Sequence, residues 1–346
     1  MPQRIEQIKK WLENELQAEI KTFEVASADA SFRRYFRVLF NNKVMGQPAG
    51  QSFIIMDAPP QKENIEPFIE IAQSLRKTGV NVPKIYAVNK TQGFILMSDL
   101  GSEAYLSLLN SDINTSDYLY SDAMNALVNI QKEFAVKNPD MQQKLPAYDE
   151  HLLKTEMDLL PDWYIKVHCQ QSLTDKEQST LDQAMKLLII SAQDQPQVFV
   201  HRDFHSRNLM VCDKEQGGNP GIIDFQDAVI GPITYDLVSL LRDSYIAWPD
   251  EKVYAWVEQY RQMLLASQLL DTDNKEQFIH WFDWMGIQRQ LKVVGIFCRL
   301  NYRDGKNNYL NDIPQTLDYL FKVCSRYTEF NDLLELLKRL GKESKA

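Results

Sequence analysis

The stretch VFVHRDFHSRNLMV, residues 198–211, sets His, Arg, Asp, His, Arg and Asn in one short loop between two apolar runs. Within it, His201, Arg202, Asp203 and Asn208 follow the pattern H-R-D-x-x-x-x-N. Asp224 ends the apolar part of GIIDF, 16 residues after the asparagine. An ordinary polar hairpin would also collect such side chains, but order, spacing and strand context together favour a reaction site.

Phosphoryl transfer is a reaction that needs these residue types in this order. A carboxylate, here Asp203, accepts the proton of an attacking hydroxyl and holds its oxygen in line with the γ-phosphate of ATP. A hard cation neutralises the phosphates, and Mg²⁺ takes oxygen ligands such as the Asn208 amide and the Asp224 carboxylate. We therefore expect Asp203 to be catalytic, Asn208 and Asp224 to bind Mg²⁺, and His201 to tie the loop to neighbouring backbone.

Bulk composition excludes several classes of partner. The chain has 346 residues and a formal net charge of −9, whereas a face that binds nucleic acid is basic. No apolar stretch approaches the roughly 18 residues that a membrane span needs, and residues 1–17 show a helical pattern without the apolar core of a signal peptide. We expect a cytoplasmic protein that acts on a small molecule, binds neither nucleic acid nor membrane, and implies no protein partner.

Signatures of other chemistries are absent from the sequence. It contains no G-x-x-x-x-G-K-[ST], no G-x-G-x-x-G and no G-x-S-x-G, which argues against a P-loop enzyme, a Rossmann site and a serine hydrolase. His201 and His205 are four residues apart, but neither H-E-x-x-H nor cysteine ligands accompany them, so we expect no zinc site. The four cysteines form no C-x-x-C pair and are typical of reduced thiols.

The periodicity of apolar residues divides the chain after residue 98. Strand-like runs, one helical stretch (residues 63–79) and polar loops fill residues 1–98. Residues 99–346 carry long amphipathic stretches, interrupted by one predicted β-hairpin that holds the charged loops. The amphipathic stretches are 116–134, 149–169, 174–193, 250–269, 273–299 and 312–340. A small β-rich lobe before a large helical lobe predicts an α+β enzyme with its site between the lobes.

The sequence resembles the aminoglycoside phosphotransferase and choline kinase family in the stretches VFVHRDFHSRNLM and GIIDFQDAVIGPITYDLVSLLRD. Four more stretches, SADASFRRYFRV, FIIMDAPP, MSDLG and IFCRLNYRDGK, are similar to the bacterial amino-sugar kinases of that family. Those enzymes phosphorylate the anomeric hydroxyl of N-acetylmuramate and N-acetylglucosamine during peptidoglycan recycling. The resemblance spans nearly the whole chain and implies a bilobal protein-kinase-like fold, with ATP and Mg²⁺ as cofactors.

The resemblance also implies where the nucleotide binds. SADASFRR stands in the place of the loop that covers the phosphates, where the small residues Ala30 and Ser31 let backbone N–H groups approach. MSDLG, with Met97 and Asp99, stands where the adenine edge meets backbone. The alternatives are a plain strand connection and an ordinary strand end.

One departure from the kinase pattern concerns the phosphate-binding lysine. The third strand, SFIIMD, carries none. Of the arginines on the preceding strand, we favour Arg34 as its replacement, although a solvated strand charge is the alternative. The missing lysine keeps a catalytically inactive nucleotide-binding regulator among the alternatives.

The acceptor pocket is expected to favour an amino sugar over a polycation. The lactyl carboxylate of N-acetylmuramate favours an arginine fork, and a sugar ring stacks on an aromatic side chain. The candidate substrate-binding residues are Trp163, Asp227, Arg299, Asn301 and Arg303. Asp236 is expected to be structural, bonding to the catalytic loop. An aminoglycoside phosphotransferase, which shares the catalytic residues, remains an alternative.

Overall fold

The computed structural model describes residues 2–28 and 32–343, which form two compact units. The first unit comprises Met1–Ile130 and Arg207–Asp227, and the second comprises Gln131–Ser206 and Ala228–Ala346. The stretch 198–211 therefore contributes to both units. The predicted division after residue 98 falls at a strand end inside the first unit and stays a prediction.

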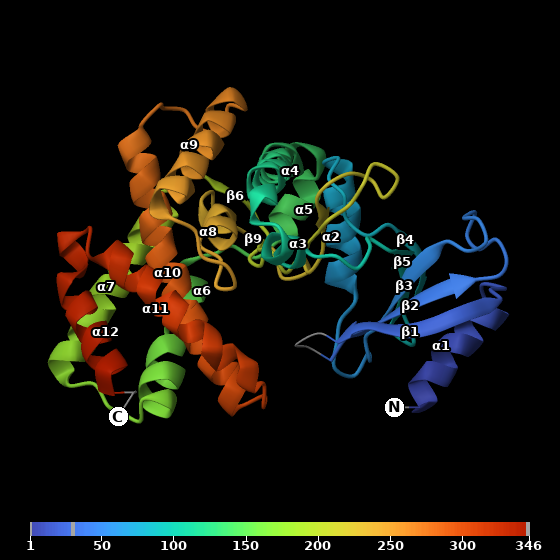
Figure 1. Cartoon of the computed structure of the whole chain (residues 1–346), viewed down its shortest axis with the longest axis horizontal. Helices are drawn as coiled ribbons and strands as arrows, with labels where there is room; N and C mark the ends of the chain where they lie inside the picture. Colours follow the sequence, from blue (N-terminus) through green and yellow to red (C-terminus); the bar gives the residue numbers. More distant parts are fainter. Residues whose placement is uncertain (1, 29–31, 344–346) are drawn as a thin grey trace. The chain divides into compact units, whose positions relative to one another are not determined.

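Five antiparallel strands form the sheet of the first unit (Figure 1). They lie in the spatial order β1-β2-β3-β5-β4, and β-branched and aromatic side chains dominate them, as the sequence predicted. The strands are β1 (Ile20–Ala28), β2 (Arg34–Phe40), β3 (Ser52–Asp57), β4 (Ile85–Asn89) and β5 (Phe94–Ser98).

Helix α1 (Pro2–Asn14) packs on one face of this sheet. Its side chains Ile8, Trp11 and Leu12 are buried in one cluster with Phe36 of β2 and Phe53 of β3. The helical pattern of residues 1–17 thus corresponds to a helix that packs within the first unit. Because alternate residues of a strand point to opposite faces, this cluster decides which strand side chains lie under α1.

The remaining elements of the first unit include the short ladder that carries Asn208 and Asp224. Strand β7 pairs with β8 through Leu209↔Ile222 and Met210↔Gly221. Helix α4 begins in the first unit and ends in the second, since the boundary follows Ile130. These elements are α2 (Glu66–Lys77), α3 (Tyr105–Ser111), η1 (Ile113–Thr115), α4 (Ser116–Lys137), β7 (Leu209–Met210) and β8 (Gly221–Ile222).

The second unit is mainly helical and is built around α10 (Lys275–Tyr302), which is buried over most of its length (Figure 1). Gly295 allows close packing here, because a Cβ at this position would lie 2.4 Å from the carbonyl oxygen of Leu159. The other elements are α5 (Pro139–Lys144), α6 (Glu150–Met157), η2 (Leu160–His168), α7 (Asp175–Gln193), β6 (Gln197–Val200), β9 (Val229–Pro232), α8 (Tyr235–Leu241), α9 (Asp250–Ala266), η3 (Asn307–Asp312), α11 (Ile313–Cys324), η4 (Thr328–Phe330) and α12 (Asn331–Glu343).

Three predicted elements differ from the structure. The amphipathic stretch 149–169 is not one helix but α6 followed by the π-helix η2, which has a proline in its first turn. Proline has no N–H and cannot continue the α-helical bond pattern. The stretch 312–340 is likewise divided into α11 and α12, with η4 between them. The predicted single hairpin consists of two ladders, β6–β9 in the second unit and β7–β8 in the first.

Among residues 2–28 and 32–343, no helix combines the length and the apolar character that crossing a membrane requires.

Candidate active site

The loop that carries Asp203 follows β6. Its backbone is hydrogen-bonded to the side chain of Asp236, which lies in the first turn of α8. The backbone N–H groups of His201 and Arg202 donate to the two carboxylate oxygens of Asp236, at 2.6 and 3.0 Å. The Asp203 N–H donates to Nδ1 of His201 at 3.3 Å. Arg202 has a φ of +77°, which costs a non-glycine residue about 1–3 kcal/mol. These hydrogen bonds offset that strain. Asp236 and His201 therefore hold the backbone of the loop from which the Asp203 side chain projects.

A second buried carboxylate, Glu156 of α6, holds the side chain of Arg202. Its Oε1 accepts from the Arg202 guanidinium and, at 2.8 Å, from the ammonium of Lys292 of α10. Its Oε2 accepts from the hydroxyl of Tyr148. Lys292 also donates to the hydroxyl of Tyr235 at 3.0 Å. Sequence analysis missed Glu156, Lys292 and both tyrosines.

The electrostatics of this buried cluster favour an ionised Asp203. Burial alone would raise the pKa of Asp203, but the Lys292 ammonium, followed by His205, His201 and Arg202, holds it below its ordinary value. A proton acceptor must be ionised to work, so this environment suits a catalytic base.

Asp236 titrates differently from its neighbour. Burial raises the pKa of Asp236 to about 7, although the bonds from the His201 and Arg202 amides oppose the shift. Asp203 and Asp236 thus have opposite pKa shifts, because cations outweigh burial at Asp203, whereas burial dominates at Asp236 and the Asp203 charge adds to it.

Asn208 and Asp224 lie side by side in the first unit. The β7–β8 ladder brings them together, and the Asn208 amide donates to Oδ2 of Asp224 at 3.3 Å. Gln226 donates to Oδ1 of Asp224 at 2.7 Å. Asp227 is exposed on the same segment. Within residues 2–28 and 32–343, no group of three or more His, Cys, Asp or Glu side chains is arranged to hold a metal ion.

The arginines of β2 point to opposite faces of the sheet. Arg34 pairs with Asp57, its cross-strand neighbour on β3, and Asp57 also binds Arg4 of α1. The predicted replacement for the missing lysine therefore lies on the face that α1 covers. Arg37 lies on the other face and binds Asp99 through two bonds of 2.6 and 3.0 Å.

The two segments predicted to contact the nucleotide are SADASFRR and MSDLG. Ala30 and Ser31 lie outside the described residues. Beyond them, the Phe32 N–H and the Arg33 guanidinium both bind the Glu63 carboxylate, at 3.1 Å each. In the MSDLG segment, Asp99 accepts from Arg37, from the Ser52 hydroxyl and from the Gly101 N–H. Met97 is buried in β5 between β3 and β4.

Asp227 belongs to the first unit, and the other four predicted acceptor residues lie on two neighbouring elements of the second unit. Trp163 is half-buried on η2, and Arg299, Asn301 and Arg303 lie at or just after the last turn of α10. Nδ1 of His168 and the hydroxyl of Tyr302 join the two elements at 3.0 Å.

The two arginines of this group have different environments. Arg303 binds its neighbour Asp304 at 2.8 and 3.0 Å. The Nε of Arg299 is buried without a hydrogen-bond partner, and burial lowers the pKa of this guanidinium. An anionic ligand would satisfy Arg299 better than it would satisfy Arg303.

Comparison with known families decides the class of protein. Residues 22–273 match the model described as the phosphotransferase enzyme family. The chain belongs to this family. A relative from Pseudomonas putida, named N-acetylmuramate/N-acetylglucosamine kinase, is 40% identical over 99% of this chain and 98% of its own length. One from Neisseria meningitidis with the same name is 38% identical over 98% and 96% of the two chains.

Solved structures show the same fold. An ADP-bound aminoglycoside phosphotransferase has a TM-score of 0.57 at 15% identity, covering 93% of this chain and 98% of that one. A choline kinase from Streptococcus pneumoniae has a TM-score of 0.59 at 11% identity, covering 92% and 99%. The predicted α+β, kinase-like fold and the predicted phosphotransferase class are confirmed, and the family implies ATP as the phosphoryl donor.

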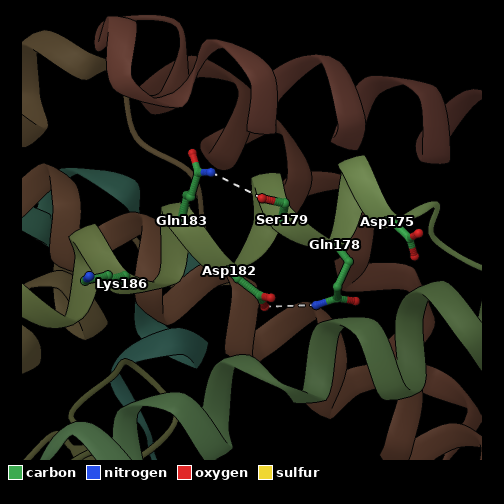
Figure 2. Close-up of a pocket in the computed structure, with 6 residues that line it drawn as sticks. All are labelled: Asp175, Gln178, Ser179, Asp182, Gln183 and Lys186. Carbon is green, nitrogen blue, oxygen red and sulfur yellow. Dashed lines mark hydrogen bonds between the residues drawn. The ribbon is translucent and has the colours of Figure 1, made fainter.

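A groove on the surface of α7 contains none of the residues proposed for phosphoryl transfer. One groove of about 360 Å³ is lined by Asp175, Gln178, Ser179, Asp182, Gln183 and Lys186, all on one helix (Figure 2). Gln178 binds Asp182 at 2.9 Å and Gln183 binds Ser179 at 3.2 Å, as i,i+4 pairs do on a solvated helix face. None of the predicted site residues lines this groove.

Proposed function

We propose that this phosphotransferase is an ATP- and Mg²⁺-dependent sugar kinase. Its acceptors are N-acetylmuramate and N-acetylglucosamine, its products are the sugar 1-phosphates, and it acts in the cytoplasm in peptidoglycan recycling. The observation that carries the proposal is the 38–40% identity, over nearly the full length, to relatives named for these two sugars. Asp203, Asn208 and Asp224 supply the reaction chemistry.

In the proposed reaction Asp203 acts on the acceptor hydroxyl. Its carboxylate orients the C1 oxygen and takes its proton as the bond to the γ-phosphorus forms. The bond between that phosphorus and the β,γ-bridging oxygen breaks, and ADP leaves. Because such transition states are loose, positioning and charge neutralisation contribute more than basicity.

Asn208 and Asp224 would hold Mg²⁺. An amide and a carboxylate side by side supply the hard oxygen donors that this ion prefers, and substrate phosphates and water complete its coordination. The small number of protein ligands fits this mode, because Mg²⁺ in kinases does not need an all-protein cage. When bound, the ion neutralises phosphate charge.

The remaining predicted residues keep the roles that the sequence resemblance implies. Residues 1–98 are proposed as the nucleotide-covering lobe, with Ala30, Ser31, Arg34, Met97 and Asp99 as its contacts, and residues 99–346 as the catalytic and acceptor lobe. The unsatisfied Nε of Arg299 supports a contact with the lactyl carboxylate. Trp163, Asp227, Asn301 and Arg303 remain proposed sugar contacts.

The test is ATP consumption with Mg²⁺ against N-acetylmuramate, N-acetylglucosamine, glucose, choline and kanamycin, with ³¹P NMR of each product. A sugar 1-phosphate from the N-acetyl sugars establishes both the acceptor and the attacking oxygen. Turnover on kanamycin alone moves the assignment to an aminoglycoside phosphotransferase. Nucleotide binding with no turnover on any of the five indicates a regulator instead.

A further inference from the structure

Lys292 lies in a buried cluster whose charges do not balance without Asp203. One carboxylate, Glu156, binds two cations, Arg202 and Lys292, which leaves one positive charge in excess. The Lys292 side chain is only 8% exposed, so water does little to screen that charge. The Asp203 carboxylate follows Arg202 directly in the chain and supplies the missing negative charge.

We propose that Lys292 is a positioning residue for phosphoryl transfer, which supplies from α10 the positive charge that the Asp203 carboxylate requires in this buried loop. Lys292 is not a catalytic residue, because its ammonium is already bound to Glu156 and to the hydroxyl of Tyr235. It acts through Arg202, which shares Glu156 with it, and through its field at Asp203.

Three observations separate this role from plain packing. Both cations bind the same oxygen, Oε1 of Glu156, so removing one changes the charge that the other meets. Tyr148 occupies Oε2, so the carboxylate has little freedom to turn toward another partner. Of the surrounding charges, the Lys292 ammonium contributes most to holding the pKa of Asp203 low.

The net charge of this cluster in each variant therefore predicts the order of the kcat values. Lys292→Met leaves Glu156, Arg202 and Asp203 with one net negative charge, which disfavours ionisation of the half-buried Asp203. The double variant Glu156→Gln/Lys292→Met restores neutrality, because only Arg202 and Asp203 remain charged. It also loses more hydrogen bonds than the single variant, so a packing role predicts the opposite order of activities.

The experiment compares kcat, the KM for ATP and thermal unfolding in the full-length protein. We expect Lys292→Met to lower kcat on the order of 10- to 100-fold, with the KM for ATP changed by no more than about twofold. The double variant should recover kcat to within about threefold of wild type. The matched control is Lys154→Met, which removes a lysine bound to Asp158 at 2.7 Å on the exposed side of α6.

Two results would overturn the proposal: wild-type kcat in Lys292→Met, or a double variant as impaired as the single one or more so. If Lys292→Met does not fold, the double variant alone tests the proposal, and its kcat should still lie within about threefold of the wild-type value. The proposal rests on the proposed function for the role of Asp203 and for the choice of acceptor. A wild-type protein that phosphorylated choline or kanamycin would contradict the sugar assignment and leave the Lys292 comparison intact.

Discussion

The buried carboxylates Asp57 and Glu156 each bind two cations, and they differ in how far those cations are exposed to water. Asp57 in the first unit binds Arg4 and Arg34, whose side chains are 24% and 25% exposed. Glu156 in the second unit binds Arg202 and Lys292, whose side chains are 22% and 8% exposed. Both cations at Asp57 reach water, whereas at Glu156 Arg202 does so and Lys292 is largely shielded from it.

The surroundings of the two clusters explain their different roles. Asp57 joins helix α1 to the ends of β2 and β3, and its arginines lie over the rings of Phe94 and Phe36. Glu156 joins α6 and α10 to the loop that carries Asp203. The same arrangement of charges therefore joins a helix to a sheet at one place and lies beside the proposed reacting group at the other.

The largest effect is expected at Asp203. Asp203→Ala removes the proton acceptor and should lower kcat by about 10³-fold while nucleotide affinity stays within about twofold of wild type. Steady-state kinetics and calorimetric titration with ATP measure the two quantities. Near-wild-type turnover would break the comparison, because the Glu156 cluster would then have no reacting group to serve.

The next effect is expected at Glu156. Glu156→Gln leaves two cations without their carboxylate, and breaking a buried pair in this way costs about 3–5 kcal/mol. The unfolding midpoint should fall by on the order of 10 °C, measured by calorimetry. A midpoint equal to that of wild type would mean that the excess charge reaches water here as it does at Asp57.

A third buried carboxylate, Asp236, is expected to make the free energy of unfolding depend on pH. The folded state holds its proton more tightly than the unfolded chain, because burial raises its pKa from 3.8 to about 7. The stability from this group is full below about pH 4 and is lost as the pH rises through 7. Between pH 5.5 and 8 the free energy of unfolding should fall by about 2 kcal/mol from this group.

Urea unfolding at the two pH values measures this slope in wild type and in Asp236→Asn, which cannot titrate. The variant should lose the slope whatever its absolute stability. An unchanged slope would assign the pH dependence to another group.

A smaller effect is expected at Asp57. Asp57→Asn should lower the free energy of unfolding by about 1–2 kcal/mol, because both arginines can turn toward water. kcat should stay at the wild-type value, and urea unfolding beside steady-state kinetics measures the contrast with Glu156→Gln. A loss of unfolding free energy as large as that of Glu156→Gln would remove the distinction between the two clusters.

The smallest effect is expected at the exposed pair Lys154–Asp158 on α6. Lys154→Met removes an ion pair whose lysine is 52% exposed, and such pairs contribute less than about 0.5 kcal/mol. The unfolding midpoint and kcat should match wild type within error. A clear loss of either would show that α6 is sensitive to any charge change, and would weaken the argument from Glu156.

Local sequence by itself predicted the class of fold and the phosphotransferase class, which are confirmed, and a reaction centre, which stays a proposal. The spacing of Asp203, Asn208 and Asp224, and the change from strand-like to helical periodicity, involve residues near one another in the chain, where pattern and chemistry are directly linked. The β3 strand, residues 52–57, has the bounds of the predicted third strand SFIIMD. The phosphotransferase class followed from the same local motifs.

Only the tertiary structure decided which distant residues serve that centre. Glu156 and Arg202 are 46 residues apart, and Lys292 and Tyr235 are 57 apart, so no local pattern announces their bonds. The placement of Arg34 under α1 depends on which face of the sheet the helix covers. In the sequence, a charged residue within a long helical stretch is most simply interpreted as solvent-exposed. Only the packing of α10 shows that Lys292 is buried beside Glu156, a carboxylate that also binds Arg202.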